Sequence, residues 1–102
     1  RVHDYGVEWA VVSYRTYGAV FFSPQGIYLA EYERKGLVSL FAADDALVAG
    51  FMIAREERMD AEETIRFSTA CAWEDSLHVE KGFRDRSEID RLASKVNIEK
   101  LD

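Results

Sequence analysis

The stretch from Ala19 to Glu33, AVFFSPQGIYLAEYE, decides the fold of this chain. Both of its ends are rich in β-branched and aromatic residues, which are typical of strands. Between them, Pro24 suits the second position of a tight turn, and Gly26 can adopt a left-handed backbone that other residues avoid. The stretch therefore predicts two antiparallel strands joined by a short turn.

Similar signals lie on both sides of this hairpin. The segments RTYG and ERKG end in Gly18 and Gly36, and strand-like runs flank them at residues 7–14 (VEWAVVSY) and 37–41 (LVSLF). Short strands at this spacing, each followed by a turn signal, are typical of an antiparallel sheet. We therefore expect a four-stranded meander at the N-terminal end.

The next segment is ambiguous between helix and strand. Residues 46–54 are apolar on all sides of a helical wheel, and periodicity alone cannot classify so short a run. Asp44 and Asp45 are good helix starts, and the Ala, Leu, Met, Arg and Glu content that follows favours a helix over 44–58. The alternative is a buried strand, which would give a small β-barrel or roll with one C-terminal helix.

Two more elements follow. Residues 64–73, TIRFSTACAW, alternate between larger and smaller side chains and predict a strand. Residues 87–97 begin with the capping sequence SEID and continue with apolar residues at helical spacing. The expected fold is therefore α+β: an antiparallel sheet of about five strands with two helices packed on one face, forming a single globular domain over residues 1–102.

The only cysteine lies close to one of the two histidines, in the segment TACAWEDSLH of residues 69–78. If this segment were a hairpin with a two-residue loop, Cys71 and His78 would lie side by side. A three-residue loop, Glu74 to Ser76, would pair Cys71 with Val79 and turn His78 to the other face. The absence of a turn glycine favours the longer loop, so we expect Cys71 to be a buried core residue and not a nucleophile.

No other pattern indicates chemistry. The chain has no H-x-x-x-H, H-E-x-x-H, C-x-x-C or calcium-loop spacing and no glycine-rich phosphate loop. We therefore expect no catalytic residue, no metal site and no cofactor.

The net charge of −6 comes entirely from the middle of the chain. Residues 42–83 carry ten acids and four bases, whereas acids and bases balance on either side. This distribution argues against binding to nucleic acid or to an anionic membrane and favours a protein partner with a basic surface. A single cysteine and the lack of a long apolar run indicate a cytoplasmic protein that does not enter a membrane.

Two features suggest a binding surface. Aromatic residues load both faces of the meander, and Tyr14, Tyr17, Tyr28 and Tyr32 are candidates for an interface with a partner or within a homodimer. Carboxylates at Glu56, Asp60 and Glu63 would share one side of a continuous helix.

These features favour a non-enzymatic protein-binding module, of the inhibitor, immunity or adaptor type. One alternative is a small-ligand-binding or cofactor-free enzyme domain with a pocket between sheet and helices. The other is an acidic mimic of nucleic acid.

Overall fold

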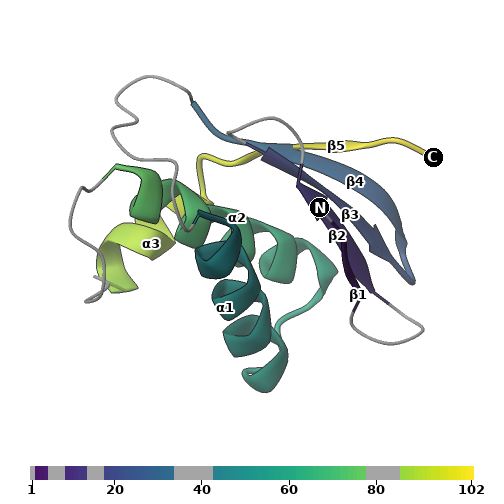
Figure 1. Ribbon diagram of the computed structural model, residues 1–102, viewed down its shortest axis with the longest axis horizontal. Coiled ribbons are helices and arrows are strands. Elements are labelled where there is room, and N and C mark those ends of the chain that lie inside the picture. The colour runs from purple at the N-terminus through teal and green to yellow at the C-terminus, as the bar shows by residue number, and fades with distance from the viewer. Residues whose placement is uncertain (1, 5–8, 14–17, 34–42, 78–85) are drawn as a thin grey trace.

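The computed structural model describes residues 2–4, 9–13, 18–33, 43–77 and 86–102. Its elements are, in order, β1 (Val2–Asp4), β2 (Ala10–Ser13), β3 (Gly18–Ser23), β4 (Gly26–Glu31), α1 (Ala43–Glu56), α2 (Ala61–Ser76), α3 (Arg86–Ala93) and β5 (Asn97–Lys100). The strands form one antiparallel sheet in the order β1-β2-β3-β4-β5, and the helices lie on one side of it (Figure 1). The predicted α+β class is confirmed.

The central hairpin forms as its sequence predicts. Ser23 pairs with Gly26, so Pro24 and Gln25 alone make the turn between β3 and β4. Gly26 has a φ of +142°, which a residue with a β-carbon rarely adopts. The Ser23 hydroxyl donates a hydrogen bond to the Gly26 carbonyl at 3.0 Å and closes the turn.

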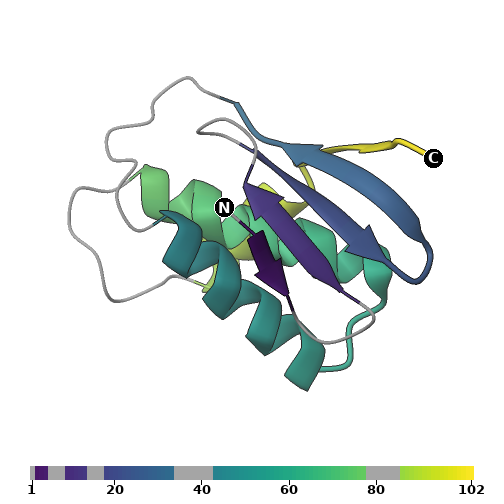
Figure 2. The same ribbon diagram turned by 45° about the vertical axis from the view of Figure 1, so that its right-hand side comes forward.

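The pairing register divides the sheet into two faces, because successive side chains along a strand point to opposite sides. The inner face carries Val11, Ala19, Phe21, Tyr28, Ala30 and Ile98 and belongs to the core under the helices. Phe21 and Ala30 at its centre are completely buried. Figure 2 shows the helices lying across this face only.

The segment predicted as a helix over 44–58 is α1, so the barrel or roll alternative is wrong. Leu47, Phe51 and Ala54 form its buried stripe. The helix ends where Arg58 adopts a left-handed backbone with φ of +60°. The amides of Arg58 and Met59 then donate to the carbonyls of Arg55 and Ala54, which is the Schellman arrangement of a helix end.

The strand predicted at 64–73 is wrong, because these residues belong to the helix α2. Every residue from Thr64 to Ser76 is buried except Arg66, which is half-buried. A helix enclosed on nearly all sides shows no polar face, so its sequence lacks the period that identifies a helix. In residues 64–73, the alternation of larger and smaller side chains therefore predicted a strand in place of the helix.

One local signal in the sequence does mark the start of this helix. The Asp60 carboxylate accepts a hydrogen bond from the Glu63 amide at 2.8 Å, and the Glu63 carboxylate accepts one from the Asp60 amide at 3.1 Å. This reciprocal pair is a capping box, which marks the first turn of a helix.

The predicted hairpin around Glu74–Ser76 is also wrong, because these residues form the last turn of α2. The question of register between Cys71 and a following strand therefore does not arise, and His78 and Val79 lie outside the described residues. Cys71 is buried as expected, with 1% of its surface exposed. It packs against α1 and not within a sheet.

The make-up of the sheet differs from the expectation. β1 and β5 were not predicted, and the strand expected at 37–41 lies outside the described residues. The helix expected over 87–97 ends at Ala93, and the chain then returns to pair with β4. Three helices, and not two, occur in the described part of the chain.

We predict that Gly50→Val destabilises the protein much more than Ala49→Val. A β-carbon on Gly50 would lie 2.8 Å from the Cys71 sulfur and 3.1 Å from the Ser68 α-carbon, so the two helices would have to separate. We expect the free energy of unfolding to fall by about 3 kcal/mol. Ala49 is exposed on the same helix, and its change to valine should cost below about 1 kcal/mol through helix propensity alone.

Chemical denaturation monitored by circular dichroism measures both variants. Equal losses in the two would contradict the close approach of α1 and α2.

Candidate functional site

Of the four tyrosines predicted to bind a partner, the two that the structure describes are largely packed into the protein. Tyr28 lies on the inner face of the sheet and is partly buried, and Tyr32 is 7% exposed. The Tyr32 ring stacks on Trp73 of α2, with ring centroids 5.5 Å apart. Tyr14 and Tyr17 lie outside the described residues. A partner-binding role for this set stays a prediction, and the two described members are packed in or against the core.

The carboxylates predicted to form an acidic row do not share one helix. Glu56 is the last residue of α1, and Asp60 and Glu63 begin α2. Asp60 and Glu63 cap that helix through the hydrogen bonds described above. Two of the three candidates therefore stabilise the local structure, and their predicted role in binding stays a prediction.

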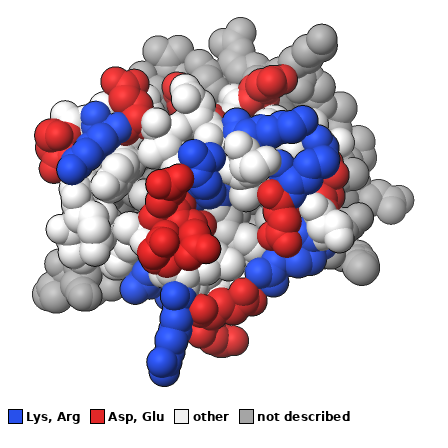
Figure 3. All heavy atoms as spheres, turned by 180° about the vertical axis from the view of Figure 1, so that it is seen from behind, with Lys and Arg blue, Asp and Glu red and all other residues white. Residues whose placement is uncertain are grey.

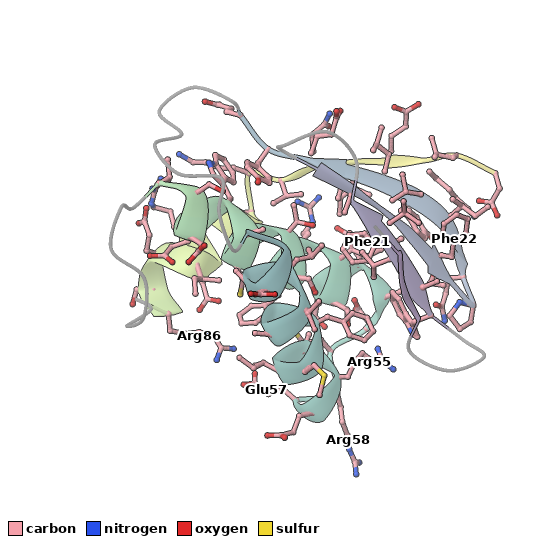
Figure 4. The ribbon with its side chains drawn as sticks, in the orientation of Figure 1. Phe21, Phe22, Arg55, Glu57, Arg58 and Arg86 are labelled. Carbon is pink, nitrogen blue, oxygen red and sulfur yellow. The ribbon has the colours of Figure 1, made fainter. Side chains whose placement is uncertain are left out.

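The C-terminal end of α1 carries a charged cluster formed by Arg55, Glu57, Arg58 and Arg86 (Figure 4). The Arg55 guanidinium lies 5.2 Å from the centre of the Trp9 ring and donates to the Met59 carbonyl at 3.2 Å. These contacts hold the α1–α2 connection against the residue that precedes β2. Arg55 therefore has a structural role.

Arg86 joins α3 to α1 in the same cluster. Its two terminal nitrogens donate to the two Glu57 carboxylate oxygens at 3.2 and 2.9 Å, a bidentate pair. The guanidinium carbon also lies 4.6 Å from the centre of the Phe67 ring. The hydrogen bond from Arg86 lowers the pKa of Glu57 below its ordinary value of 4.5. The pair binds two helices together and leaves both side chains half exposed.

The start of α1, at the opposite end of the helix from the charged cluster, carries an exposed carboxylate. Asp45 lies in the first turn of the helix and is exposed, while the next residues, Ala46 and Leu47, are buried and anchor the turn to the core. The backbone N–H groups at a helix start point along the axis and favour negatively charged groups. A carboxylate beside such a start can accept a proton from a ligand held there.

On the face opposite to that of Figure 1, acidic and basic side chains are interleaved and neither charge dominates (Figure 3). Among the described residues, exposed ion pairs include Arg66 with Glu62 at 2.9 Å and Arg91 with Glu88 at 2.6 Å. Within the described ranges, no three His, Cys, Asp or Glu side chains gather as metal ligands. None of the helices in that part of the chain is long and apolar enough to cross a membrane.

Comparison with known proteins gives a consistent result. The model of one family, described as pfkB family carbohydrate kinase, matches residues 1–76. The 1-phosphofructokinase of Bacillus subtilis is 29% identical over 101 residues, which cover 99% of this chain and 33% of that protein. The 1-phosphofructokinase of Haemophilus influenzae is 29% identical over 94 residues, covering 91% of this chain and 30% of that protein.

A solved structure agrees in fold. The crystal structure of a possible 1-phosphofructokinase from Thermotoga maritima superposes with a TM-score of 0.77 at 22% identity. The match covers 93% of this chain and 30% of the other. The chain thus spans about a third of the length of the curated relatives it matches.

These findings overturn the expected function. A non-enzymatic binding module of the inhibitor, immunity or adaptor type is wrong, and so are a protein partner as the main ligand and an acidic mimic of nucleic acid, because the matched family consists of carbohydrate kinases. The alternative of an enzyme domain agrees in class with the matched family, and its pocket between sheet and helices stays a prediction. Phe21 from the sheet and Ile65 from α2 are completely buried core residues between these layers.

We predict that Asp60→Ala lowers the free energy of unfolding by about 1 kcal/mol, because it removes the N-cap of a buried helix. Glu56→Ala, which changes an exposed carboxylate outside the capping box, should change it by less than about 0.5 kcal/mol. Urea denaturation of the two variants measures the difference. Equal effects would mean that the capping box does not stabilise α2.

The Glu57–Arg86 pair predicts a dependence of stability on pH. Because the pKa of Glu57 is lowered in the folded state, its contribution is complete above about pH 4.5 and is lost as the pH falls through the folded pKa. Arg86→Gln should remove this loss, so the stability of the variant should fall less steeply below pH 4.5. The size is small because the pair is exposed to solvent.

Urea denaturation between pH 7 and pH 3 tests this dependence. Glu57→Gln serves as the matched variant, since it should flatten the profile in the same way. A steep acid dependence retained in both variants would assign it to other groups.

Proposed function

Because the chain belongs to the pfkB carbohydrate kinase family, we propose that it forms part of an enzyme that transfers a phosphoryl group from a nucleoside triphosphate to a sugar. The observation that carries this proposal is the family match over residues 1–76, which takes in β1 to β4 and both long helices. The relatives are named 1-phosphofructokinase, so fructose 1-phosphate is the first substrate to test. We also propose that such an enzyme works in the cytoplasm, which the single cysteine and the lack of a long apolar run favour.

Phosphoryl transfer makes two demands on the protein. Hydrogen-bond donors must stabilise the negative oxygens of the transferred group, and a base must accept the proton of the attacking hydroxyl. The backbone N–H groups at the start of a helix are suitable donors for phosphoryl oxygens. A helix start that also carries an available carboxylate would supply both the donors and the base.

The start of α1 meets both demands best. At the start of α2, the Asp60 and Glu63 side chains already bond to the backbone amides. At the start of α3, the Arg86 guanidinium is paired with Glu57, and the Glu88 carboxylate accepts from Arg91. α1 begins at Ala43, and the exposed Asp45 in its first turn makes no such hydrogen bond or ion pair with the other described residues.

We therefore assign the base to Asp45. In the proposed step, the oxygen of the sugar hydroxyl attacks the terminal phosphorus of the nucleotide, and the bond from that phosphorus to the diphosphate breaks. The hydroxyl proton passes to the Asp45 carboxylate. Kinases commonly also use Mg²⁺ held by carboxylates and by the nucleotide. The described residues gather no set of protein ligands for it, so we assign no metal contact to them.

We predict that Asp45→Asn lowers kcat for phosphorylation of fructose 1-phosphate by about 10²- to 10⁴-fold in the whole protein, with a smaller effect on KM. The reason is that the amide is isosteric with the carboxylate and cannot accept the proton. A coupled assay for nucleoside diphosphate release, with ATP as the donor, measures the loss. Asp90→Asn makes the same chemical change on the exposed surface of α3 and should keep the activity.

The outcomes separate the parts of this proposal. Full activity of Asp45→Asn would remove the assignment of the base, and loss of activity in Asp44→Asn alone would move it to the neighbouring residue. A wild-type protein that phosphorylates neither fructose 1-phosphate nor another sugar would contradict the proposed function as a whole.

A further inference from the structure

We propose that Gly50 is a positioning residue for the phosphoryl transfer. By letting α1 lie directly against the backbone of α2, it fixes the place of the Asp45 carboxylate five residues earlier in the same helix. Gly50 acts through Asp45 and not by contact with a substrate. This inference rests on the proposed function, since it takes Asp45 to be the base.

The contact across the two helices explains why a glycine stands inside α1, where glycine is a poor helix former. A β-carbon at position 50 would lie 2.8 Å from the Cys71 sulfur, 2.9 Å from the Cys71 β-carbon and 3.1 Å from the Ser68 α-carbon. Favourable contacts between carbon atoms are about 3.5 to 4.0 Å long. An alanine at position 50 would therefore separate the two helices by about 0.5 to 1 Å at this point.

The separation cannot be avoided by rotation of a side chain. The Cys71 β-carbon is bonded directly to the α2 backbone, and the Ser68 α-carbon is part of it. α2 is also packed against β3, β4 and α3, so it cannot move away from α1 without disturbing the rest of the core. The displacement therefore falls on α1.

The C-terminal end of α1 is held by contacts that Gly50 does not share. The Arg55 guanidinium lies 5.2 Å from the centre of the Trp9 ring. Glu57, which follows the last residue of the helix, pairs with Arg86 at 2.9 Å (Figure 4). A displacement at Gly50 therefore turns α1 about this held end.

Such a turn is enlarged at Asp45, because Asp45 lies further from the held end than Gly50 does. At a rise of 1.5 Å per residue, Gly50 lies about 10 Å from Glu57 along the helix axis, and Asp45 lies about 18 Å from it. A shift of about 0.5 to 1 Å at Gly50 thus becomes about 1 to 2 Å at Asp45. A misplacement of about 1 Å can lower the rate of a reaction by about 10²-fold.

The test introduces Gly50→Ala into the whole protein and measures phosphorylation of fructose 1-phosphate with ATP. We expect kcat to fall by about 10- to 100-fold, with a smaller effect on KM. Crystal structures superposed on α2 should show Asp45 displaced by about 1 Å or more, with Glu57 in place. Ile89→Val is the matched control, because it trims a buried residue of α3 and adds no atom between α1 and α2. It should keep kcat.

A second substitution should restore both the position of Asp45 and the activity. Cys71→Gly removes the sulfur and the β-carbon that the new methyl group would meet. We expect Gly50→Ala combined with Cys71→Gly to recover kcat to within about threefold of Cys71→Gly alone. A purely structural role of Gly50 predicts no such recovery, because Cys71→Gly places another poor helix former in α2.

Cys71→Ala removes only the sulfur, so its combination with Gly50→Ala should recover part of kcat. Circular dichroism and the unfolding midpoint establish that each variant is folded at the assay temperature. If Gly50→Ala alone does not fold, the two double variants replace it, and kcat should be higher with Cys71→Gly than with Cys71→Ala.

A further variant tests whether Gly50 acts through Asp45. In the Asp45→Asn background, Gly50→Ala should lower kcat by less than about twofold, because the group whose position it changes is already removed. Independent effects would instead multiply.

Three results would overturn this inference. One is an unchanged kcat in folded Gly50→Ala, another is a crystal structure of that variant with Asp45 in place, and the third is an equal loss in the wild-type and Asp45→Asn backgrounds. Each leaves the proposed function standing if the wild type is active and Asp45→Asn is not. A wild type that phosphorylates no sugar would instead remove the proposed function, and this inference with it.

Discussion

The close approach of α1 and α2 at Gly50 is the contact on which the rest of the structure depends. The absence of a side chain there lets the α1 backbone lie directly against Cys71 and Ser68. α2 can then contact α1 on one side and β3, β4 and α3 on others. The helix is enclosed because its neighbours come this close, and the small residues along it, such as Ala70 and Ala72, fit that arrangement.

Because α2 is enclosed, its buried polar side chains depend on hydrogen bonds within the protein, and two of its serines find theirs locally. The hydroxyls of Ser68 and Ser76 donate to carbonyls four residues earlier in the same helix, at 2.6 and 2.9 Å. Arg66 extends from α2 and donates to the Ala93 and Val96 carbonyls at 3.1 and 2.8 Å. That contact fixes the end of α3 and directs the chain into β5. One helix thus positions the core, the last helix and the last strand.

The residues that stabilise the fold and the residue proposed to act in catalysis lie in different parts of the structure. The inner face of the sheet and the buried sides of the helices form the core, and the charged cluster at the end of α1 ties Trp9, α1 and α3 together. Under the proposed function, the chemistry takes place at the opposite end of α1, where the exposed carboxylate of Asp45 lies in the first helical turn. A helix held rigidly by close packing is a suitable support for such a group, because phosphoryl transfer depends on accurate positioning.

The sequence by itself determined the elements that local rules specify. The turn at Pro24 and Gly26, the flanking strands β3 and β4, the helix after Asp44 and Asp45, and the burial of Cys71 all follow from backbone preference and side-chain polarity. These properties belong to a few consecutive residues, so they can be recognised without the rest of the chain.

Only the tertiary structure decided the identity of α2, the pairing of β5 with β4 and the roles of the polar residues. Enclosure on all sides removes the polar stripe that announces a helix, so the capping box of Asp60 and Glu63 was the only local sign of α2. Tyr32 became a core residue because Trp73, 41 positions later in the sequence, stacks on it. The sequence indicates Asp45 only as a helix cap, and its candidate role follows from the local hydrogen bonds that engage the carboxylates at the starts of α2 and α3. Such contacts join residues far apart in the chain, and no local pattern records them.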